Sequence, residues 1–334
     1  MFLAQAVTVV VAVLLIISAI TSLSMKRQHG DGGHLEVRKL NDRLKQLKDG
    51  VRHAMLDSAS FKKQHKQDAK RAKREAKLAK KSPDQQKNRT FVLDFKGDVQ
   101  ASGVGHLRTE ITAIMTMAEE TDEVVVRLES PGGAVHGYGL AASQLDRIRA
   151  KKIPLVVVVD KVAASGGYLM AAVADKILAA PFAVLGSIGV IAQIPNLHRL
   201  LKKHDVDVEV LTAGKYKRTL TVLGENTEEG REKFKEELEE VHLLFQEFVG
   251  SRRPQLDMEE VATGEAWYGQ RALERKLVDD ISTSDEYLTN ACKERDVFEV
   301  QWIEHKKPIE RLMAQMEGVF IGILERINHI GRTG

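Results

Sequence analysis

The chain contains a single cysteine, Cys292, in 334 residues, and no cluster of cysteine and histidine has the spacing of zinc ligands. An internal disulfide is therefore excluded, and we expect neither a metal site nor a cofactor. A Walker A sequence is absent, so no step driven by ATP is expected. Nothing in the chain repeats at a fixed period, which excludes a solenoid.

Charged side chains are missing from residues 1–25, where the stretch Leu3–Leu23 is almost wholly apolar or small. About 20 apolar residues of a helix, each rising ~1.5 Å, cross a ~30 Å hydrocarbon core. A cleaved signal peptide fits less well, because the apolar run is long and no basic residue precedes it. We therefore predict a transmembrane anchor over residues 1–25. The basic residues that follow it favour a cytoplasmic body by the positive-inside rule.

The net charge of +3 conceals an asymmetry along the chain. Residues 26–89 hold 20 Lys and Arg against 8 Asp and Glu, whereas acidic residues are in excess elsewhere. This range predicts a basic helical connector, which either contacts anionic lipid head groups or serves as a solvated spacer. It lacks interleaved aromatic residues and a reading motif, so no nucleic-acid partner is expected.

Residues 90–303 alternate between strand-like and helix-like patterns, which predicts βαβ units and a largely parallel sheet of an α/β protein. The expected strands cover residues 90–95, 123–128, 153–160, 176–180, 187–191 and 206–211, with a turn at Leu185–Gly186 between the fourth and the fifth. The expected helices cover residues 106–120, 134–149, 169–174, 196–203 and 227–249. The last of these helices is highly charged, and we expect it to lie on the outside of the body.

The stretch Val162–Tyr168, with the sequence V-A-A-S-G-G-Y, follows one of the buried strands directly. A serine at such a strand-to-helix junction lies near free N–H groups, which stabilise developing negative charge. By itself this pattern fits a helix cap equally well. The loops 130–133, 163–167 and 212–217 all follow predicted strands, where ligands of α/β sheets collect. They supply backbone donors, a hydroxyl and an amine, the set that acyl transfer needs.

The base that would activate Ser165 has several candidates. His136 and His198 lie outside the three loops, and Ser165 is not in a G-x-S-x-G sequence. A lysine is the stronger candidate, provided that an apolar pocket lowers the pKa of its amine from ~10.4 towards neutrality. Lys215 and Lys217 both qualify, and in an extended segment they share a face, so the pattern does not choose between them.

Four segments in order along the chain carry a family resemblance, and together they resemble the signal-peptide-peptidase-A family of serine peptidases, family S49. They are S-P-G-G at 130–133, A-S-G-G-Y at 164–168, G-S-I-G-V at 186–190 and A-G-K-Y-K at 213–217. The anchor, the connector and two further segments, H-G-Y-G at 136–139 and G-E-N-T at 224–227, resemble its bacterial inner-membrane branch. The resemblance covers essentially the whole chain. It implies a ClpP/crotonase-like ββα superhelix in residues 90–303.

The resemblance also implies the roles of individual residues. Ser165 matches the nucleophile of a Ser/Lys dyad, Lys217 matches its general base, and Ser187 matches a serine that orients the amine. The implied oxyanion donors are backbone N–H groups of Gly132, Gly133 and Gly166.

The resemblance further implies a homo-oligomer in which the lysine can come from a neighbouring protomer. It also implies a closing helix over 264–281 that packs Trp267 on the core. The expected location is the bacterial inner membrane, with a periplasmic body by the resemblance and a cytoplasmic one by the charge rule.

The C-terminal segment 304–334 has apolar residues at helical spacing from 307 to 330, which predicts an amphipathic helix. It would dock on its own body, a neighbouring subunit or a membrane surface. The function predicted overall is that of a membrane-anchored, ATP-independent serine endopeptidase for short, extended, hydrophobic peptides, such as remnant signal peptides or membrane-protein fragments. The alternatives are a catalytically silent membrane scaffold and an acyl-CoA enzyme of the crotonase type, in which the dyad would have no role.

Overall fold

The computed structural model describes residues 33–57 and 88–304, together with residues 59–60, 62–63, 66–68, 70 and 74 between them. The predicted anchor over 1–25, most of the predicted connector beyond residue 57 and the predicted C-terminal helix over 307–330 lie outside the described residues. No helix within the described ranges has both the length and the hydropathy to cross a membrane. The described residues divide into two compact units, one within residues 37–301 and one that includes the ranges 33–36 and 302–304.

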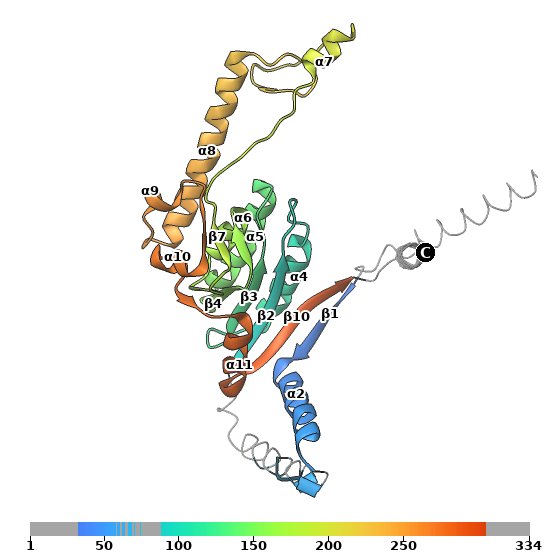
Figure 1. The fold of residues 1–334 in the computed structure, drawn as a ribbon, viewed down its shortest axis with the longest axis vertical. Helices are drawn as coiled ribbons and strands as arrows, with labels where there is room; N and C mark the ends of the chain where they lie inside the picture. The colour runs from blue at the N-terminus through green and yellow to red at the C-terminus, as the bar shows by residue number, and fades with distance from the viewer. Residues whose placement is uncertain are drawn as a thin grey trace, which may run out of the picture. The chain divides into compact units, whose positions relative to one another are not determined.

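A seven-stranded sheet in the order β1-β10-β2-β3-β4-β6-β9 organises the described part of the chain (Figure 1). All neighbouring pairs from β10 to β9 are parallel. Its strands are β1 (Gly33–Lys39), β2 (Arg89–Lys96), β3 (Glu123–Glu129), β4 (Leu155–Val159), β6 (Lys176–Ala179), β9 (Asp280–Ile281) and β10 (Asp296–Glu304). The interior strand β4 is buried along its whole length, as expected where helices cover both faces of a parallel sheet. The predicted mixed α/β fold is confirmed.

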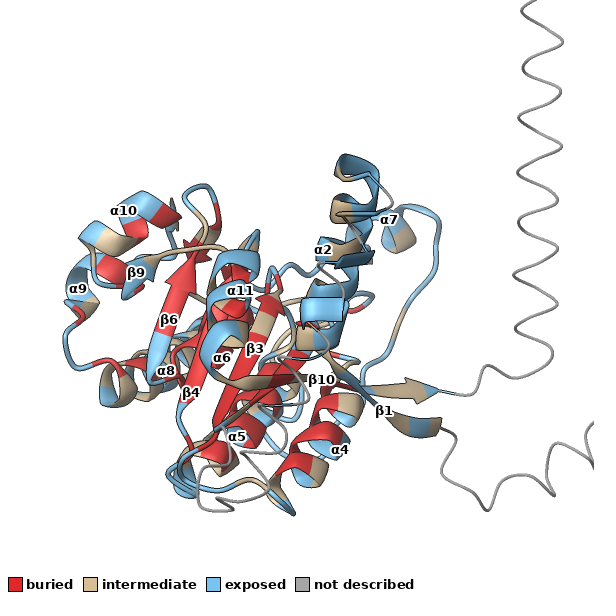
Figure 2. Ribbon diagram, turned by 90° about the horizontal axis from the view of Figure 1, so that it is seen from below, coloured by how far each residue is buried: buried red, intermediate tan, exposed pale blue. Residues whose placement is uncertain are grey.

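Helices cover both faces of this sheet (Figure 2). On one face lie α4 (Val104–Met115), α5 (Val135–Ala150) and α6 (Gly166–Ala171), where Phe95 packs edge-on against Tyr138 at 6.4 Å between ring centroids. On the other face lie α2 (Leu40–Met55) and α11 (Ser284–Glu294), which pack Leu40 and Leu288 against Val92 of β2. Successive residues of a strand point to opposite faces, so each strand contributes to both cores.

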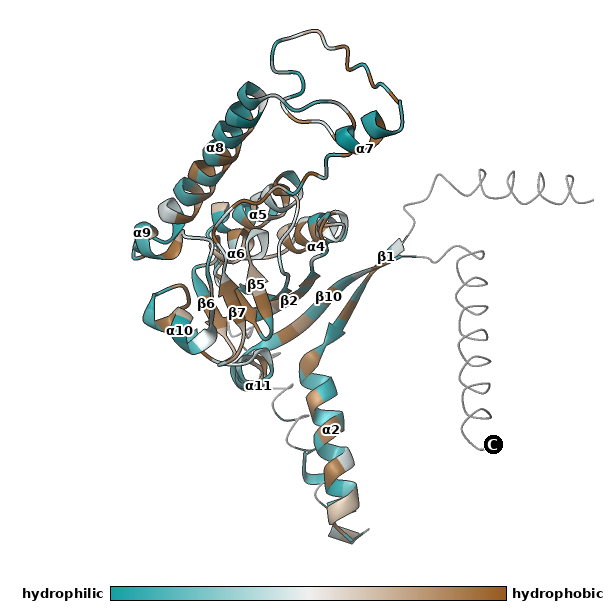
Figure 3. Cartoon of the chain, turned by 45° about the horizontal axis from the view of Figure 1, so that its top comes forward, coloured by the Kyte–Doolittle hydropathy of each residue, from teal (hydrophilic) through white to brown (hydrophobic). Residues whose placement is uncertain are grey.

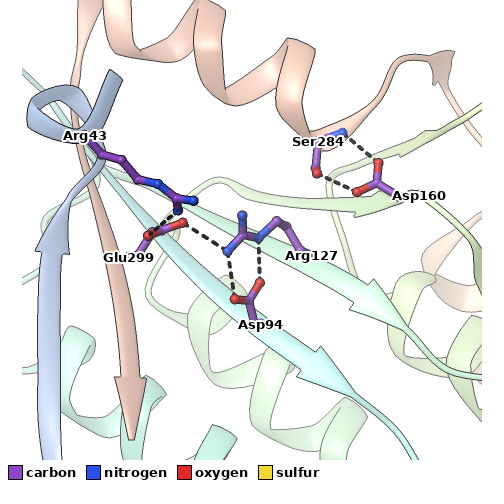
Figure 4. A network of polar contacts seen from close by, with 6 residues as sticks. All are labelled: Arg43, Asp94, Arg127, Asp160, Ser284 and Glu299. Carbon is purple, nitrogen blue, oxygen red and sulfur yellow. Dashed lines mark hydrogen bonds and ion pairs between the residues drawn. The ribbon is translucent and has the colours of Figure 1, made fainter. Parts of the chain in front are cut away.

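Polar contacts across the sheet surface accompany this second helical layer (Figure 4). Arg127 of β3 donates hydrogen bonds to Asp94 of β2, at 2.5 and 2.7 Å, and to Glu299 of β10 at 3.1 Å. Ser284 at the start of α11 donates to Asp160, just beyond β4, from its backbone N–H at 2.8 Å and its hydroxyl at 2.5 Å. The strand β10 and the helix α11 are therefore fixed to the central strands by charged groups as well as by apolar packing.

The buried carboxylate of Asp122 joins the start of β2 to the turn before β3. It accepts hydrogen bonds from the backbone N–H of Arg89 at 3.0 Å, from the Arg89 guanidinium at 3.0 and 2.6 Å, and from the Glu119 N–H at 2.9 Å. Burial alone raises the pKa of Asp122, but these donors outweigh it and hold the pKa below its usual value.

We expect Asp122→Asn to lower the free energy of unfolding by about 2 kcal/mol at neutral pH, because it weakens hydrogen bonds to a buried charge. The pKa of Asp122 is lower in the folded chain than in the unfolded chain. The stabilisation is therefore complete above the unfolded pKa of ~3.9 and is lost as the pH falls through the folded value. Urea unfolding from pH 7 to pH 3 should show the difference from wild type shrinking towards acid. Exposed Asp285→Asn is the control, and a difference that stays constant with pH would contradict the assignment.

A second sheet, in the order β5-β7-β8, carries the strands that lead to the site. It consists of β5 (Val162–Ala164), β7 (Val184–Gly186) and β8 (Ala266–Tyr268), with β5 and β7 parallel and β8 antiparallel to β7. The sequence predicted a strand at 187–191 after a turn at Leu185–Gly186, and this was wrong. The strand lies where the turn was expected, because β7 pairs on both sides with segments distant in the sequence.

Two further predictions were wrong in the second half of the chain. The range 206–211 has no strand partner and is irregular. The range 264–281 is not a single helix but β8, α10 (Gly269–Glu274) and β9, with Trp267 in the strand opposite Leu185. Three further helices in this half of the described chain are α7 (His198–Lys203), α8 (Glu228–Arg252) and α9 (Met258–Val261).

Candidate active site

Ser165 lies in the single-residue turn between β5 and α6. Its backbone has φ 52° and ψ −121°, a conformation that is strained for a residue with a side chain. The Ser165 N–H donates to the Gly186 carbonyl at 2.8 Å, which fixes the turn to the neighbouring strand β7. Sharp strained turns of this kind present a serine hydroxyl at the end of a strand. The sequence-based prediction of a strand-to-helix junction around this residue is confirmed.

The register of the small sheet brings two serines to the same edge. Ala164 is paired with Gly186 in parallel β5 and β7, so Ser165 and Ser187 are the next residues along two adjacent strands. Ser187 also has a positive φ, 51°, and its N–H donates to the Glu265 carbonyl at 2.6 Å. Both predicted serines therefore lie side by side in the structure, each in a strained backbone held from a neighbouring segment.

The turn after β3 packs directly against Ser165. Gly132 has φ +91°, and a Cβ atom there would lie 2.7 Å from the Cβ of Ser165 and 2.8 Å from the nitrogen of Gly166. The Gly132 N–H donates to Ser130 Oγ at 3.1 Å. A Cβ at Gly133 would lie 2.2 Å from the Val99 carbonyl oxygen, so this turn is confined from behind as well. Only glycine fits these close approaches, and the first two predicted loops meet here.

These residues line a cleft with a volume of about 770 Å³, which includes Ser165, Ser187, Gly132, Gly133 and Gly166. The rest of the lining is largely apolar, and part of it comes from α8 through Val241, Leu244, Phe245 and Phe248. The prediction that α8 lies on the outside therefore fails for this face. The four residues follow i, i+3, i+4 and i+7 spacing, a helical stripe that was visible in the sequence.

Lys217, by contrast, does not line this cleft. It is exposed in the loop before α8, and Figure 1 places that loop beside α7, away from the two sheets. Nearby Lys215 forms an ion pair with Glu229 in the first turn of α8, at 2.9 Å. Glu229 precedes Phe245 of the cleft by 16 residues, or ~24 Å along a helix axis. The third predicted loop is thus remote from the other two within one chain.

The surroundings of Lys215 also disfavour it as a base. Its Nζ lies 4.9 Å from the centroid of the Tyr216 ring, and interactions with Tyr216 and Glu229 raise the pKa of its amine. A general base needs the opposite shift. This argues against Lys215, which the sequence pattern left open beside Lys217.

No described side chain forms a hydrogen bond with the Ser165 hydroxyl, so no base is in place within the described part of the chain. His136 is exposed on α5, and His198 begins α7. The sequence analysis missed His242, which lies in the cleft lining, with its Nε2 3.2 Å from the Ile188 carbonyl oxygen. Within the described ranges, no three His, Cys, Asp or Glu side chains are grouped as metal ligands would be.

The fold and this cleft agree with what comparison of the sequence with known families shows: the chain belongs to peptidase family S49. The model of the S49 N-terminal region matches residues 1–145, and that of peptidase family S49 matches residues 147–298. The predicted family is confirmed.

Among its relatives, "Probable protease SohB" of Haemophilus influenzae is 49% identical over 327 residues, covering 95% of this chain and 93% of that protein. The protein of the same name from Buchnera aphidicola subsp. Acyrthosiphon pisum is 56% identical over 230 residues, covering 69% of this chain and 68% of the relative. A solved mutant of the 1510-N membrane-bound stomatin-specific protease with a substrate peptide has 14% identity and a TM-score of 0.41, covering 69% of this chain and 98% of that one.

Proposed function

We propose that this S49 peptidase is a serine endopeptidase of the bacterial inner membrane, with Ser165 as nucleophile and Lys217 as general base. The observation that carries the proposal is the strained turn at Ser165, held in an apolar cleft with the Gly132–Gly133 turn packed against it. The proposed fold of residues 90–303 is of the ClpP/crotonase type. The proposed anchor is the apolar segment 1–25.

Ser165 Oγ would attack the carbonyl carbon of a peptide bond while its proton passes to the Lys217 amine. The carbonyl oxygen would become an oxyanion and accept hydrogen bonds from backbone N–H groups of Gly133 and Gly166. The Gly132 N–H already donates to Ser130 and is not an oxyanion donor in this proposal. Gly132 contributes instead by having no side chain, which lets the turn pack closely against Ser165. Lys217 would return the proton to the leaving amine, and water would then hydrolyse the acyl-enzyme by the same base.

The dyad is completed in this proposal by a second copy of the chain. The segment between Ile188 and α8 exposes many apolar side chains, including Ile191 and Leu211, each 90% exposed (Figure 3). Apolar surface of this extent is typical of a subunit interface. A neighbouring protomer that covers it would bring Lys217 of one chain to Ser165 of the next. Ser187, adjacent to Ser165, would then accept or donate a hydrogen bond to orient the amine.

The substrate class follows from the cleft and from the expected location. Its apolar lining from α8 favours hydrophobic side chains, and the glycines beside Ser165 leave room for an extended substrate backbone to approach closely. With no ATP-driven unfolding expected, substrates would reach the cleft already unfolded. Remnant signal peptides and fragments of membrane proteins meet these requirements.

The proposal is tested by labelling the full-length protein in detergent with a fluorophosphonate probe and locating the adduct by mass spectrometry. We expect labelling on the peptide that contains Ser165, none in Ser165→Ala, and unchanged labelling in Ser143→Ala. Ser143 is a matched serine on α5, whose hydroxyl donates to the Gly139 carbonyl at 2.8 Å. A correctly assembled wild-type protein that takes no label at Ser165 would favour the silent scaffold.

A further inference from the structure

The side chain of Tyr138 is completely buried in α5, behind the turn that faces Ser165. Its hydroxyl donates to the Asp98 carbonyl at 2.8 Å and lies 2.5 Å from Ser130 Oγ. Ser130 Oγ in turn accepts the hydrogen bond from the Gly132 N–H at 3.1 Å. Four groups thus form a continuous chain of hydrogen bonds from the loop after β2 to the turn after β3.

The direction of every bond in this chain is fixed by its two ends. The Asp98 carbonyl can only accept, so the Tyr138 proton points to it; the Gly132 N–H can only donate, so it points to Ser130. The Ser130 proton is then left for the oxygen of Tyr138. Burial raises the pKa of Tyr138, which keeps its hydroxyl protonated and able to donate. The chain therefore fixes the orientation of the Gly132 peptide, and through it the N–H of Gly133 that follows.

The ring of Tyr138 contacts the other proposed oxyanion donor. A Cβ atom at Gly166 would lie 2.4 Å from the Cγ of Tyr138, so the ring packs directly against the backbone that follows the nucleophile. The Gly132–Gly133 turn is fixed from behind, where the Ala134 N–H donates to the Val99 carbonyl at 2.7 Å. One buried side chain thus touches Gly166 through its ring and reaches Gly132 through its hydroxyl.

We propose that Tyr138 and Ser130 are positioning residues that hold the two oxyanion donors in register with Ser165. This deepens the proposed function and depends on it, since it takes Ser165 as the nucleophile. The competing interpretation is that the hydroxyl of Tyr138 only stabilises the fold. The two differ in what its removal does to the chemical step.

The test compares Tyr138→Phe with Tyr168→Phe in full-length protein. Tyr168 is a matched control, because it is also completely buried, and its hydroxyl donates at 2.8 Å to the Leu277 carbonyl, away from the turn. We expect Tyr138→Phe to slow phosphonylation of Ser165 by a fluorophosphonate about 10- to 100-fold, since a misplaced oxyanion donor weakens transition-state binding. The kcat for a hydrophobic peptide should fall in parallel, with KM within about twofold, because the substrate contacts of the cleft remain. Tyr168→Phe should react at nearly the wild-type rate with a similar loss of thermal stability.

Ser130→Ala and the double variant complete the experiment. If the two hydroxyls act through one series of hydrogen bonds, the double variant should react no more slowly than the slower single variant. If they act independently, the two reductions in rate would multiply. Multiplied effects, or equal rates for Tyr138→Phe and Tyr168→Phe, would overturn the inference while leaving labelling of wild-type Ser165 intact. Absent labelling of the wild type would instead refute the proposed function. If Tyr138→Phe does not fold, Ser130→Ala is compared with Tyr168→Phe in the same way. If neither Tyr138→Phe nor Ser130→Ala folds, these hydrogen bonds are required for folding alone, and the inference is overturned.

Discussion

Chains with Ser165→Ala and chains with Lys217→Ala should each be inactive alone and regain peptidase activity when they assemble together. Loss of either member of a catalytic dyad lowers kcat by about 10⁴- to 10⁶-fold, as in other hydrolases in which the residues act as a unit. In a mixed oligomer, the intact lysine of one chain meets the intact serine of its neighbour. With equal expression and random mixing, about a quarter of the head-to-tail junctions would hold both residues, so at least a quarter of wild-type activity is expected once oligomers of a single variant are removed.

The measurement requires oligomers that contain both chains. Two different affinity tags on the co-expressed variants allow tandem purification, and hydrolysis of a hydrophobic fluorogenic peptide then reports the sites. Lys215→Ala is the matched control, and it should keep activity within about tenfold of wild type, since Lys215 is paired with Glu229 rather than poised as a base. Inactive mixed oligomers would contradict a dyad that is shared between chains.

The central strands could be predicted from the sequence because the residues of each strand indicate its conformation without reference to distant parts of the chain. Runs such as Leu155–Val159 are continuous and β-branched, and only a strand covered on both faces accommodates them. The nucleophile turn was predictable for the same reason, since the stretch Val162–Tyr168 follows such a run after only two residues. Boundaries of β2 differ from the prediction by one residue at both ends, and those of β3 and β6 by one residue at the C-terminal end only.

The small sheet could not be predicted, because its pairing connects distant parts of the chain. Strand β7 is only three residues long and exists through its partners β5 and β8, the latter about 80 residues further on. The β-branched residues Val190 and Ile191 look more like a strand, yet they have no partner in the described chain and line the cleft instead. Local β propensity identifies a strand only when a neighbouring strand is available.

The exposed segment before α8 shows a second feature that the sequence pattern does not determine, namely what covers its apolar residues. Val206, Val210 and Leu211 are exposed in this structure, although their pattern resembles that of a half-buried strand. A hydrophobic pattern shows that a residue is to be covered, but not whether its own chain or a second copy covers it. The role of Tyr138 was equally hidden, because its hydroxyl contacts reach a backbone carbonyl at Asp98 and, through Ser130, the backbone N–H of Gly132.

Gly132→Ala should abolish most of the activity, with a fall of about 10²- to 10³-fold in kcat, as for loss of an oxyanion donor. At φ +91° an added methyl group forces a strained backbone, and here it would also meet the Cβ of Ser165 at 2.7 Å and the Ala164 carbonyl at 2.8 Å. Both neighbours belong to a turn fixed by β7, so the glycine turn itself must move and carry the Gly133 N–H away from the oxyanion.

The matched control is Gly105→Ala in α4, where an added Cβ meets nothing within 4 Å. It should keep full activity and gain up to about 1 kcal/mol of stability, since alanine favours a helix over glycine. The rates of fluorophosphonate labelling and peptide hydrolysis measure the effect, and thermal unfolding reports whether the fold is intact. A folded Gly132→Ala protein with near wild-type kcat would mean that the turn against Ser165 has no part in stabilising the oxyanion.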